Sequence, residues 1–188
     1  HPYHQPPLNQ DASYAGYGAF NDDEALQWFE LAYKNSWQLM VHGNGDAAID
    51  QFIKTATVAQ QNNPAADRRT VLIHGQYLRE DQVASLEALD IFPALYPMHT
   101  FYWGDWHRQS VAGPERAENI SPTGWLLDRD MKFSIHSDAP VTLPNSMRVL
   151  HSAVNRTTRS GATLGEYHRV DPLTAIKAMT IWPAYQHF

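Results

Sequence analysis

The sequence predicts an α/β fold of the (β/α)8, or TIM-barrel, type, of which this chain holds about four β/α units. Three short apolar runs have the pattern of buried strands and end on a metal-binding side chain followed by a small polar turn: LMVHGNGD, VLIHGQ and FSIHSDAP. Helical patterns separate the runs, and alternating strands and helices predict a parallel sheet. Because a complete barrel needs eight strands and about 250 residues, this chain of 188 residues amounts to half of one.

Cap residues and apolar spacing define the first two units. Asn21 precedes three acidic residues and starts a helix whose apolar stripe runs to Tyr33. A strand is expected over residues 37–42. After the GNGD turn, Asp46 is expected to cap a second helix that ends before the loop at 62–64.

Three further strands are expected at residues 70–74, 91–95 and 132–136, with a helix over 79–89 between the first two. Residues 96–119 are rich in aromatic residues, glycine and proline. Because this segment is too long for an ordinary connection, we expect a long active-site loop or lid there.

The last helices are marked by proline. Ser121-Pro122 and Asp171-Pro172 have the cap-then-proline order typical of a helix start. A third helix is expected after Pro144, with an inward face formed by Met147, Leu150 and Val154.

Composition excludes several functions. The net charge is −6 and no basic stripe is present, so we expect no nucleic-acid partner. No apolar run is long enough to cross a membrane, so no membrane partner is expected either. Without cysteine, metal chemistry must use His, Asp and Glu. The chain begins at His1 without a methionine or a signal-peptide pattern, so we expect any targeting signal to lie in an upstream segment.

Two architectures fit the order of elements. An open doubly wound sheet is possible, but the turn HGNGD lacks the dinucleotide fingerprint and no P-loop occurs. A barrel fits the chemistry at the strand ends better. Half a barrel leaves unpaired strand edges, so we expect the remainder of the polypeptide or a second copy, in a homo-oligomer, to cover them.

The candidate metal ligands are His42, His74 and Asp138, which follow successive strands and should converge at one end of the sheet. Neutral imidazoles bind divalent metal ions, and a carboxylate can bind through one oxygen while its other oxygen accepts the proton of an attacking water. Asp138 is therefore the candidate general base, and the expected reaction is hydrolysis. A single histidine at a strand end is more often a satisfied polar residue, and only the three together favour a metal site.

Candidate substrate contacts lie in the 96–119 segment. His99 is placed to orient a substrate carbonyl or leaving group, with Asp105 and His107 nearby. The aromatic residues of the segment could wall an apolar pocket or simply cover the rim of the barrel; they are Phe101, Tyr102, Trp103 and Trp106. Arg116 and Arg156 could pair with substrate carboxylates, although internal ion pairs are the commoner use of such residues.

Several motifs together resemble the YtcJ-like branch of the metal-dependent amidohydrolases, within amidohydrolase family 3, over nearly the whole chain. They are VHGNGDAAID, the strand-end HGQ, PMH followed by GD, and SDAPV leading into PNSMRVLHSAVNR. The resemblance implies a (β/α)8 barrel with one or two divalent ions, usually zinc. It implies that His42 and His74 are the ligands on the fifth and sixth strands, and that Asp138 is the acid of the eighth strand.

The same resemblance places this chain in the C-terminal half of the barrel, on strands 5–8. The HxH pair of the family's first strand is missing from these 188 residues. His136 departs from the family pattern, in which glycine is commoner before Ser-Asp. We therefore interpret residues 1–188 as a single fragment of a catalytic barrel domain, and we expect the isolated fragment to be inactive.

The function expected from these residues is hydrolysis of carbon–nitrogen bonds of amide type, other than peptide bonds, in a small-molecule substrate. The alternative is a non-catalytic fold remnant or interaction domain that assembles through its open sheet edges. A third possibility is a sugar- or nucleotide-binding α/β domain that binds without turnover.

Overall fold

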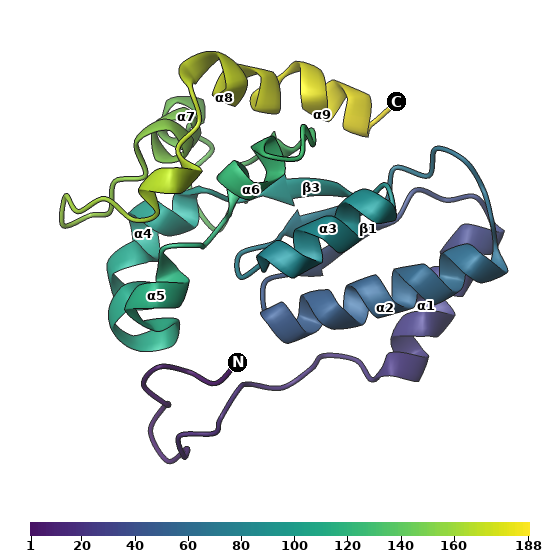
Figure 1. Cartoon of the computed structure of the whole chain (residues 1–188), viewed down its shortest axis with the longest axis horizontal. Coiled ribbons are helices and arrows are strands. Elements are labelled where there is room, and N and C mark those ends of the chain that lie inside the picture. The colour runs from purple at the N-terminus through teal and green to yellow at the C-terminus, as the bar shows by residue number, and fades with distance from the viewer.

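A computed structural model describes residues 1–188 of the protein. At its centre is a parallel sheet of four strands in the order β1-β2-β3-β4 (Figure 1). The strands are β1 (Met40–Gly43), β2 (Val71–His74), β3 (Phe92–Leu95) and β4 (Ser134–Ile135). The predicted α/β class and parallel sheet are confirmed. Each strand pairs with the next strand in the sequence, which is the order of a barrel wall, whereas a doubly wound sheet reverses its strand order at one point.

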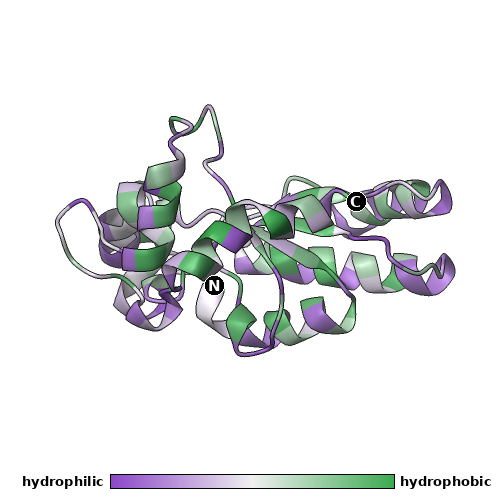
Figure 2. Cartoon of the chain, turned by 90° about the horizontal axis from the view of Figure 1, so that it is seen from above, coloured by the Kyte–Doolittle hydropathy of each residue, from purple (hydrophilic) through white to green (hydrophobic).

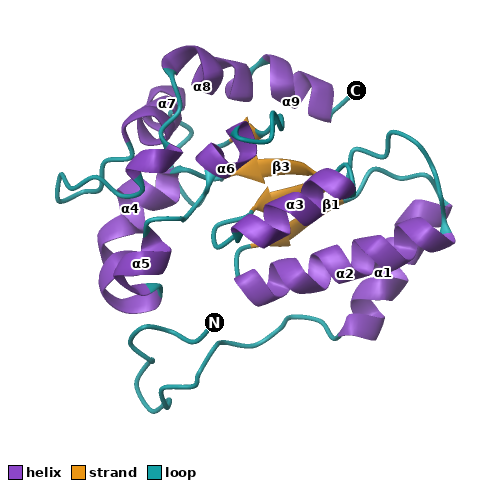
Figure 3. Ribbon diagram, in the orientation of Figure 1, coloured by secondary structure: helices purple, strands orange, loops and turns teal.

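Helices surround the sheet, and α4 and α5 lie beyond the carboxyl ends of the strands (Figure 3). They are α1 (Asp22–Lys34), α2 (Asp46–Asn62), α3 (Glu80–Ala88), α4 (Met98–Trp106), the π-helix η1 (His107–Val111), α5 (Gly113–Ala117), α6 (Thr123–Leu127), α7 (Ser146–Asn155), the 3-10 helix η2 (Glu166–His168), α8 (Pro172–Met179) and α9 (Ile181–Gln186). No helix combines the length and the hydropathy needed to cross a membrane.

The two faces of the sheet differ in how they are covered. Leu72 and Leu95 belong to the main core, together with buried residues of α1, α2 and α3. Hydrophobic and hydrophilic bands alternate along these helices, as expected when one side packs inward (Figure 2). The opposite face carries a smaller cluster around Val71 and Phe92, and on the edge strand Met40 is 39% exposed. One covered face and one partly open face are compatible with part of a barrel wall.

Two of the predicted helix caps are observed. Asn21 and Glu24 form a capping box at the start of α1, and the Asp171 carboxylate accepts the first backbone N–H groups of α8. The cap predicted at Asp46 is wrong, because Gly45 is the N-cap of α2 and Asp46 is the first helical residue. The Asp46 carboxylate accepts from its neighbour Ala47 instead.

The segment 96–119 differs most from expectation, because it is helical over α4, η1 and α5 rather than a loop. Gly104 and Pro114 have positions that these helices tolerate. Gly104 lies inside α4, where a Cβ atom would come within 2.9 Å of Leu164 and Thr158. Pro114 occupies the first turn of α5, where it removes no helical hydrogen bond.

Two further elements also depart from the sequence pattern. The fourth strand covers only Ser134–Ile135 rather than residues 132–136. In α7, Met147 is 71% exposed, and the buried residues are Val149, Ser152 and Ala153. Leu150 and Val154 are half-buried and pack against the main core as expected, so Met147 is the one expected inward residue that points away from it.

Arg156 is held by backbone carbonyls rather than by a carboxylate. It is fully buried, and its guanidinium donates to the backbone carbonyls of Leu164, Ser121 and Ile120. These bonds join the end of α7 to the turn before α6. Arg156 is therefore a structural residue.

We predict that Arg156→Ala lowers the free energy of unfolding by roughly 3 kcal/mol or more, because three buried carbonyls lose their donors. Urea denaturation of the natural full-length protein measures this change. The control is Arg129→Ala, because Arg129 pairs with Glu87 at the surface and such pairs contribute about 0–1 kcal/mol. Equal effects of the two substitutions would contradict the structural role of Arg156.

Candidate metal centre

The carboxyl ends of the strands bring the three sequence-predicted ligands together. His42 lies in β1, His74 ends β2 and Asp138 follows β4. The rings of His42 and His74 are 4.6 Å apart and nearly perpendicular. His74 Nε2 lies 3.9 Å from Asp138 Oδ1.

A fourth group, His136, also belongs to this cluster. His74, His136 and Asp138 each offer a ligand atom, and these atoms lie within 4.8 Å of one another. His42 is outside this tightest set, although its ring touches that of His74. The sequence marked His136 only as a departure from a family pattern, and it gave no spacing signal that would place the residue beside His74.

Two residues of the cluster have unusual backbone conformations. His74 has φ +78° and Asp138 has φ +52°, in the left-handed region that residues other than glycine rarely adopt. Such conformations cost about 1–3 kcal/mol each and cluster at functional sites. In both residues, the strained backbone supports a functional role.

At His74 the strain is linked to the direction of the side chain. His42 pairs with Ile73, so their side chains share the sheet face opposite the main core. By simple alternation His74 would follow Leu72 into that core. The left-handed backbone ends this alternation, and the His74 ring lies against the ring of His42.

Burial favours the uncharged form of three imidazoles at this site, those of His74, His136 and His99. It lowers the pKa of His74 to about 4, and the neighbouring His136 adds to this effect while Asp138 opposes it. Burial also lowers the pKa of His136, and it holds the pKa of His99 well below its usual value. Neutral imidazoles are the form that binds a metal ion.

Unsatisfied nitrogen atoms test whether the site fits a cation. His74 Nδ1, His99 Nδ1 and His136 Nε2 are buried without a hydrogen-bond partner. Buried polar atoms are normally satisfied, so the exceptions at His74 and His99, which line one pocket together with Asp138, require an explanation. A donor set of imidazole nitrogens and carboxylate oxygens fits a divalent metal ion such as zinc.

A pocket of about 330 Å³ opens above the cluster and is lined by both His74 and Asp138. Its opposite wall comes from one side of the helical segment, and consists of His99, Trp103, Trp106 and His107. These four residues have the spacing i, i+4, i+7 and i+8, which is one face of a helix. The sequence indicates Trp103 and Trp106 as candidate pocket walls and His107 as a neighbour of His99, and all four residues line the pocket, on a helical face rather than on a loop.

His107 is fixed by its neighbours at the rim of the pocket. Its Nδ1 lies 2.6 Å from the Tyr77 hydroxyl, and its Nε2 lies 2.7 Å from Gln76 Nε2. Burial lowers the pKa of His107 to about 4. Gln76 also lines the pocket, and it directly follows the strand-end HG turn.

Tyr102 and Asp105 do not line the pocket. The ring of Tyr102 contacts that of Phe101, and the Arg159 guanidinium lies 5.0 Å from the Tyr102 ring. Asp105 accepts hydrogen bonds from the backbone and hydroxyl of Ser160. Tyr102 and Asp105 therefore face the 156–165 segment, because successive helical residues point about 100° apart.

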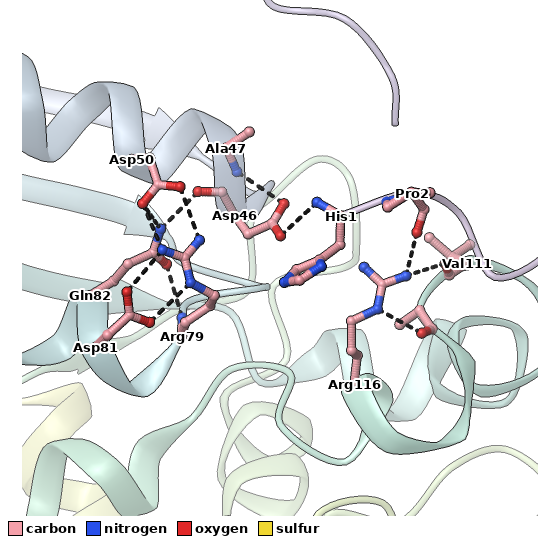
Figure 4. A network of polar contacts seen from close by, with 11 residues as sticks. His1, Pro2, Asp46, Ala47, Asp50, Arg79, Asp81, Gln82, Val111 and Arg116 are labelled. Carbon is pink, nitrogen blue, oxygen red and sulfur yellow. Dashed lines mark hydrogen bonds and ion pairs between the residues drawn. The ribbon is translucent and has the colours of Figure 1, made fainter. Parts of the chain in front are cut away.

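Asp46 and Arg116 are occupied by contacts within the chain (Figure 4). Asp46 Oδ2 lies 2.8 Å from the amino group of His1. Arg116 donates to the carbonyls of Pro2, Val111 and Ala112. Together these contacts tie the first residues of the chain to α2 and α5, and neither side chain lines the pocket.

A parallel α/β fold with histidines and a carboxylate at the strand ends is typical of metal-dependent hydrolases, and comparison with known proteins identifies the family. The chain matches the model of the amidohydrolase family over residues 1–188, and it belongs to that family. It is 25% identical over 173 residues to an N-substituted formamide deformylase of Arthrobacter pascens, covering 92% of this chain and 32% of that protein.

Two solved structures share the fold. An uncharacterized metal-dependent hydrolase of Pyrococcus furiosus superposes with a TM-score of 0.78 at 22% identity, covering 98% of this chain and 35% of that one. An uncharacterized metal-dependent hydrolase of Pyrococcus horikoshii OT3 also gives a TM-score of 0.78, at 19% identity, covering 97% of this chain and 35% of that one. The chain thus spans about a third of the length of these proteins.

We predict that stability falls as the pH is lowered from neutral toward 4. Burial lowers the pKa of His107 to about 4 and that of His168 to about 3, below the ordinary value of 6.5. Between these values the unfolded chain binds more protons, so this stability is present above about pH 6.5 and is lost below it. The urea midpoint should therefore be lower at about pH 5 than at about pH 7.5.

The matched variants for this measurement are His168→Asn and His151→Asn. The first removes a buried titrating group and should weaken the pH dependence of the midpoint. The second changes an exposed residue of α7 and should leave that dependence as it is. A midpoint that is constant or rises toward acid pH would disprove the prediction.

Proposed function

We propose that the natural protein is a metal-dependent hydrolase that cleaves carbon–nitrogen bonds of amide type, other than peptide bonds. The observation that carries this proposal is the gathering of His42, His74 and Asp138 at the carboxyl ends of parallel strands, beside a pocket. Membership of the amidohydrolase family supports it. The name of the curated relative, a deformylase of N-substituted formamides, supports the type of bond.

The proposed cofactor is a divalent metal, zinc, as one or two ions held by His42, His74 and Asp138. When bound, such an ion supplies an acidified water and polarises the carbonyl that the water attacks. The Asp138 carboxylate would accept a proton from the attacking water and return it to the departing amine nitrogen. Its side chain is 31% exposed and lines the pocket, so the carboxylate can reach both groups.

The pocket limits the substrate by its charge and its walls. No Lys or Arg lines it, and the buried histidines are neutral. Trp103 and Trp106 offer aromatic surface. We therefore propose a small amide without a negative charge near the scissile bond, with an apolar or aromatic group against Trp103. His99 orients its carbonyl or leaving group, while Tyr102 faces away from this pocket.

The open side of the sheet supports the proposal that further protein covers it. β1 is an edge strand, and Trp37 and Met40 near this edge are 58% and 39% exposed. We propose that residues 1–188 form strands 5–8 and the associated helices of a TIM barrel, in the YtcJ-like branch of the family. The remainder of the barrel, or a second copy of this chain, would then cover the edge. In this arrangement the helical segment 96–119 borders the active site.

We predict that His74→Ala in the natural full-length protein abolishes stoichiometric zinc binding and the release of amine from small amides, including N-substituted formamides. Elemental analysis and an amine assay measure the two effects. His151→Ala, at an exposed position of α7, is the control and should retain both. Wild-type protein that holds no zinc after supply of the metal, or a His74→Ala variant that keeps full activity, would overturn the proposal.

We further predict that Asp138→Asn lowers kcat by about 10²–10⁴-fold with little change in KM, because the amide has the shape of the acid but accepts no proton. The matched control is Asp105→Asn, which alters a carboxylate bound to Ser160 outside the pocket. Steady-state kinetics with one amide substrate compares them. Equal losses in the two variants would rule out Asp138 as the base.

A further inference from the structure

His136 could serve the centre in one of two ways. One nitrogen could bind the metal directly, since His136 belongs to the tight set with His74 and Asp138. Alternatively, the imidazole could hold another residue of the site in place. The hydrogen bond between the His136 ring and the backbone of Asp138 distinguishes these two roles.

The backbone N–H of Asp138 donates to His136 Nδ1 at 3.1 Å. A ring nitrogen that accepts a hydrogen bond carries no proton, so in the neutral imidazole the proton is on Nε2. The lone pair of Nδ1 is therefore occupied, and Nε2 has none to offer a cation. Both nitrogens are thus unsuited to metal binding while this bond persists.

The hydrogen bond to His136 is made by the backbone of Asp138, which has a left-handed conformation. Asp138 has φ +52°, and its carbonyl accepts from Val141 N at 2.7 Å, which closes a tight turn. The N–H of the same residue points back to the ring two positions earlier. This hydrogen bond therefore helps to hold Asp138 in its left-handed conformation.

The His136 ring is itself fixed by packing. It lies 5.5 Å from the Tyr96 ring at an interplanar angle of 20°. The Tyr96 hydroxyl donates to Thr142 Oγ1 at 3.0 Å, and Thr142 Oγ1 donates to the carbonyl of Ser137. A closed set of contacts thus joins β3, His136 and both sides of the Asp138 turn.

We propose that His136 is a positioning residue and not a metal ligand: through Nδ1 it holds the Asp138 backbone so that the carboxylate faces His74. The inference rests on the proposed function for the role of Asp138. Loss of a residue that supports a ligand typically costs 10–100-fold in metal affinity or activity.

Variants that separate the two nitrogens test this assignment in the natural full-length protein. In His136→Asn the amide oxygen can occupy the position of Nδ1 and accept the Asp138 N–H, whereas His136→Leu keeps bulk without an acceptor. We expect His136→Leu to lose about 10–100-fold in kcat and zinc affinity, and His136→Asn to recover most of that loss. Equal losses in both variants, with His136→Gln recovering the zinc affinity through the Nε2 position, would overturn the proposal.

A second measurement needs neither activity nor metal. In the zinc-free protein, ¹⁵N NMR of labelled histidine should show the Nε2–H tautomer for His136. Hydrogen exchange of the Asp138 amide should be slow in wild type and His136→Asn and fast in His136→Leu. The Nδ1–H tautomer, or equal exchange in all three proteins, would overturn the assignment even if His136→Leu is poorly folded. If no amide is hydrolysed, the proposed function fails while this readout still decides the role of His136.

Discussion

The arrangement of the site depends on one constraint, which is that consecutive parallel strands end at the same edge of a sheet. This places His42, His74 and Asp138 together although up to 96 residues separate them in the chain. Proximity of strand ends does not by itself aim the side chains. The left-handed backbone conformations of His74 and Asp138 help to set the directions of the two side chains. The packed core of the sheet offsets the cost of these conformations.

Burial supports the same arrangement electrostatically. His74 and His136 have lowered pKa values because their charged forms would lose hydration on burial, and a neutral imidazole is the form that binds a cation. Burial also leaves His74 Nδ1 and His99 Nδ1 without hydrogen-bond partners, which costs stability. Polar atoms that stay unpaired in the protein are available to a bound ligand, as a binding centre requires. A histidine with a purely structural role has its hydrogen bonds satisfied within the protein, as His168 has by Gly124 and Asn119.

The sequence predicted the sheet, its parallel sense and the grouping of three residues, because apolar runs ending in histidine or near an acid are local patterns. It failed where tertiary contacts decide the outcome. Gly104 lies inside α4, where the close approach of Leu164 leaves no room for a Cβ atom, and this contact between distant segments is not visible in the local sequence. The hydrogen bond between Asp138 and His136 depends on a backbone conformation that no residue pattern specifies. Arg156 likewise binds three carbonyls whose positions only the fold determines.

The central claim is that imidazoles of β1 and β2 and the carboxylate after β4 share one cation. Anomalous X-ray diffraction from crystals of the natural full-length protein grown with zinc tests it most directly. The account predicts a zinc peak at about 2.0–2.2 Å from both a His74 nitrogen and an Asp138 oxygen. Zinc bound elsewhere, with these two side chains free of metal, would contradict it.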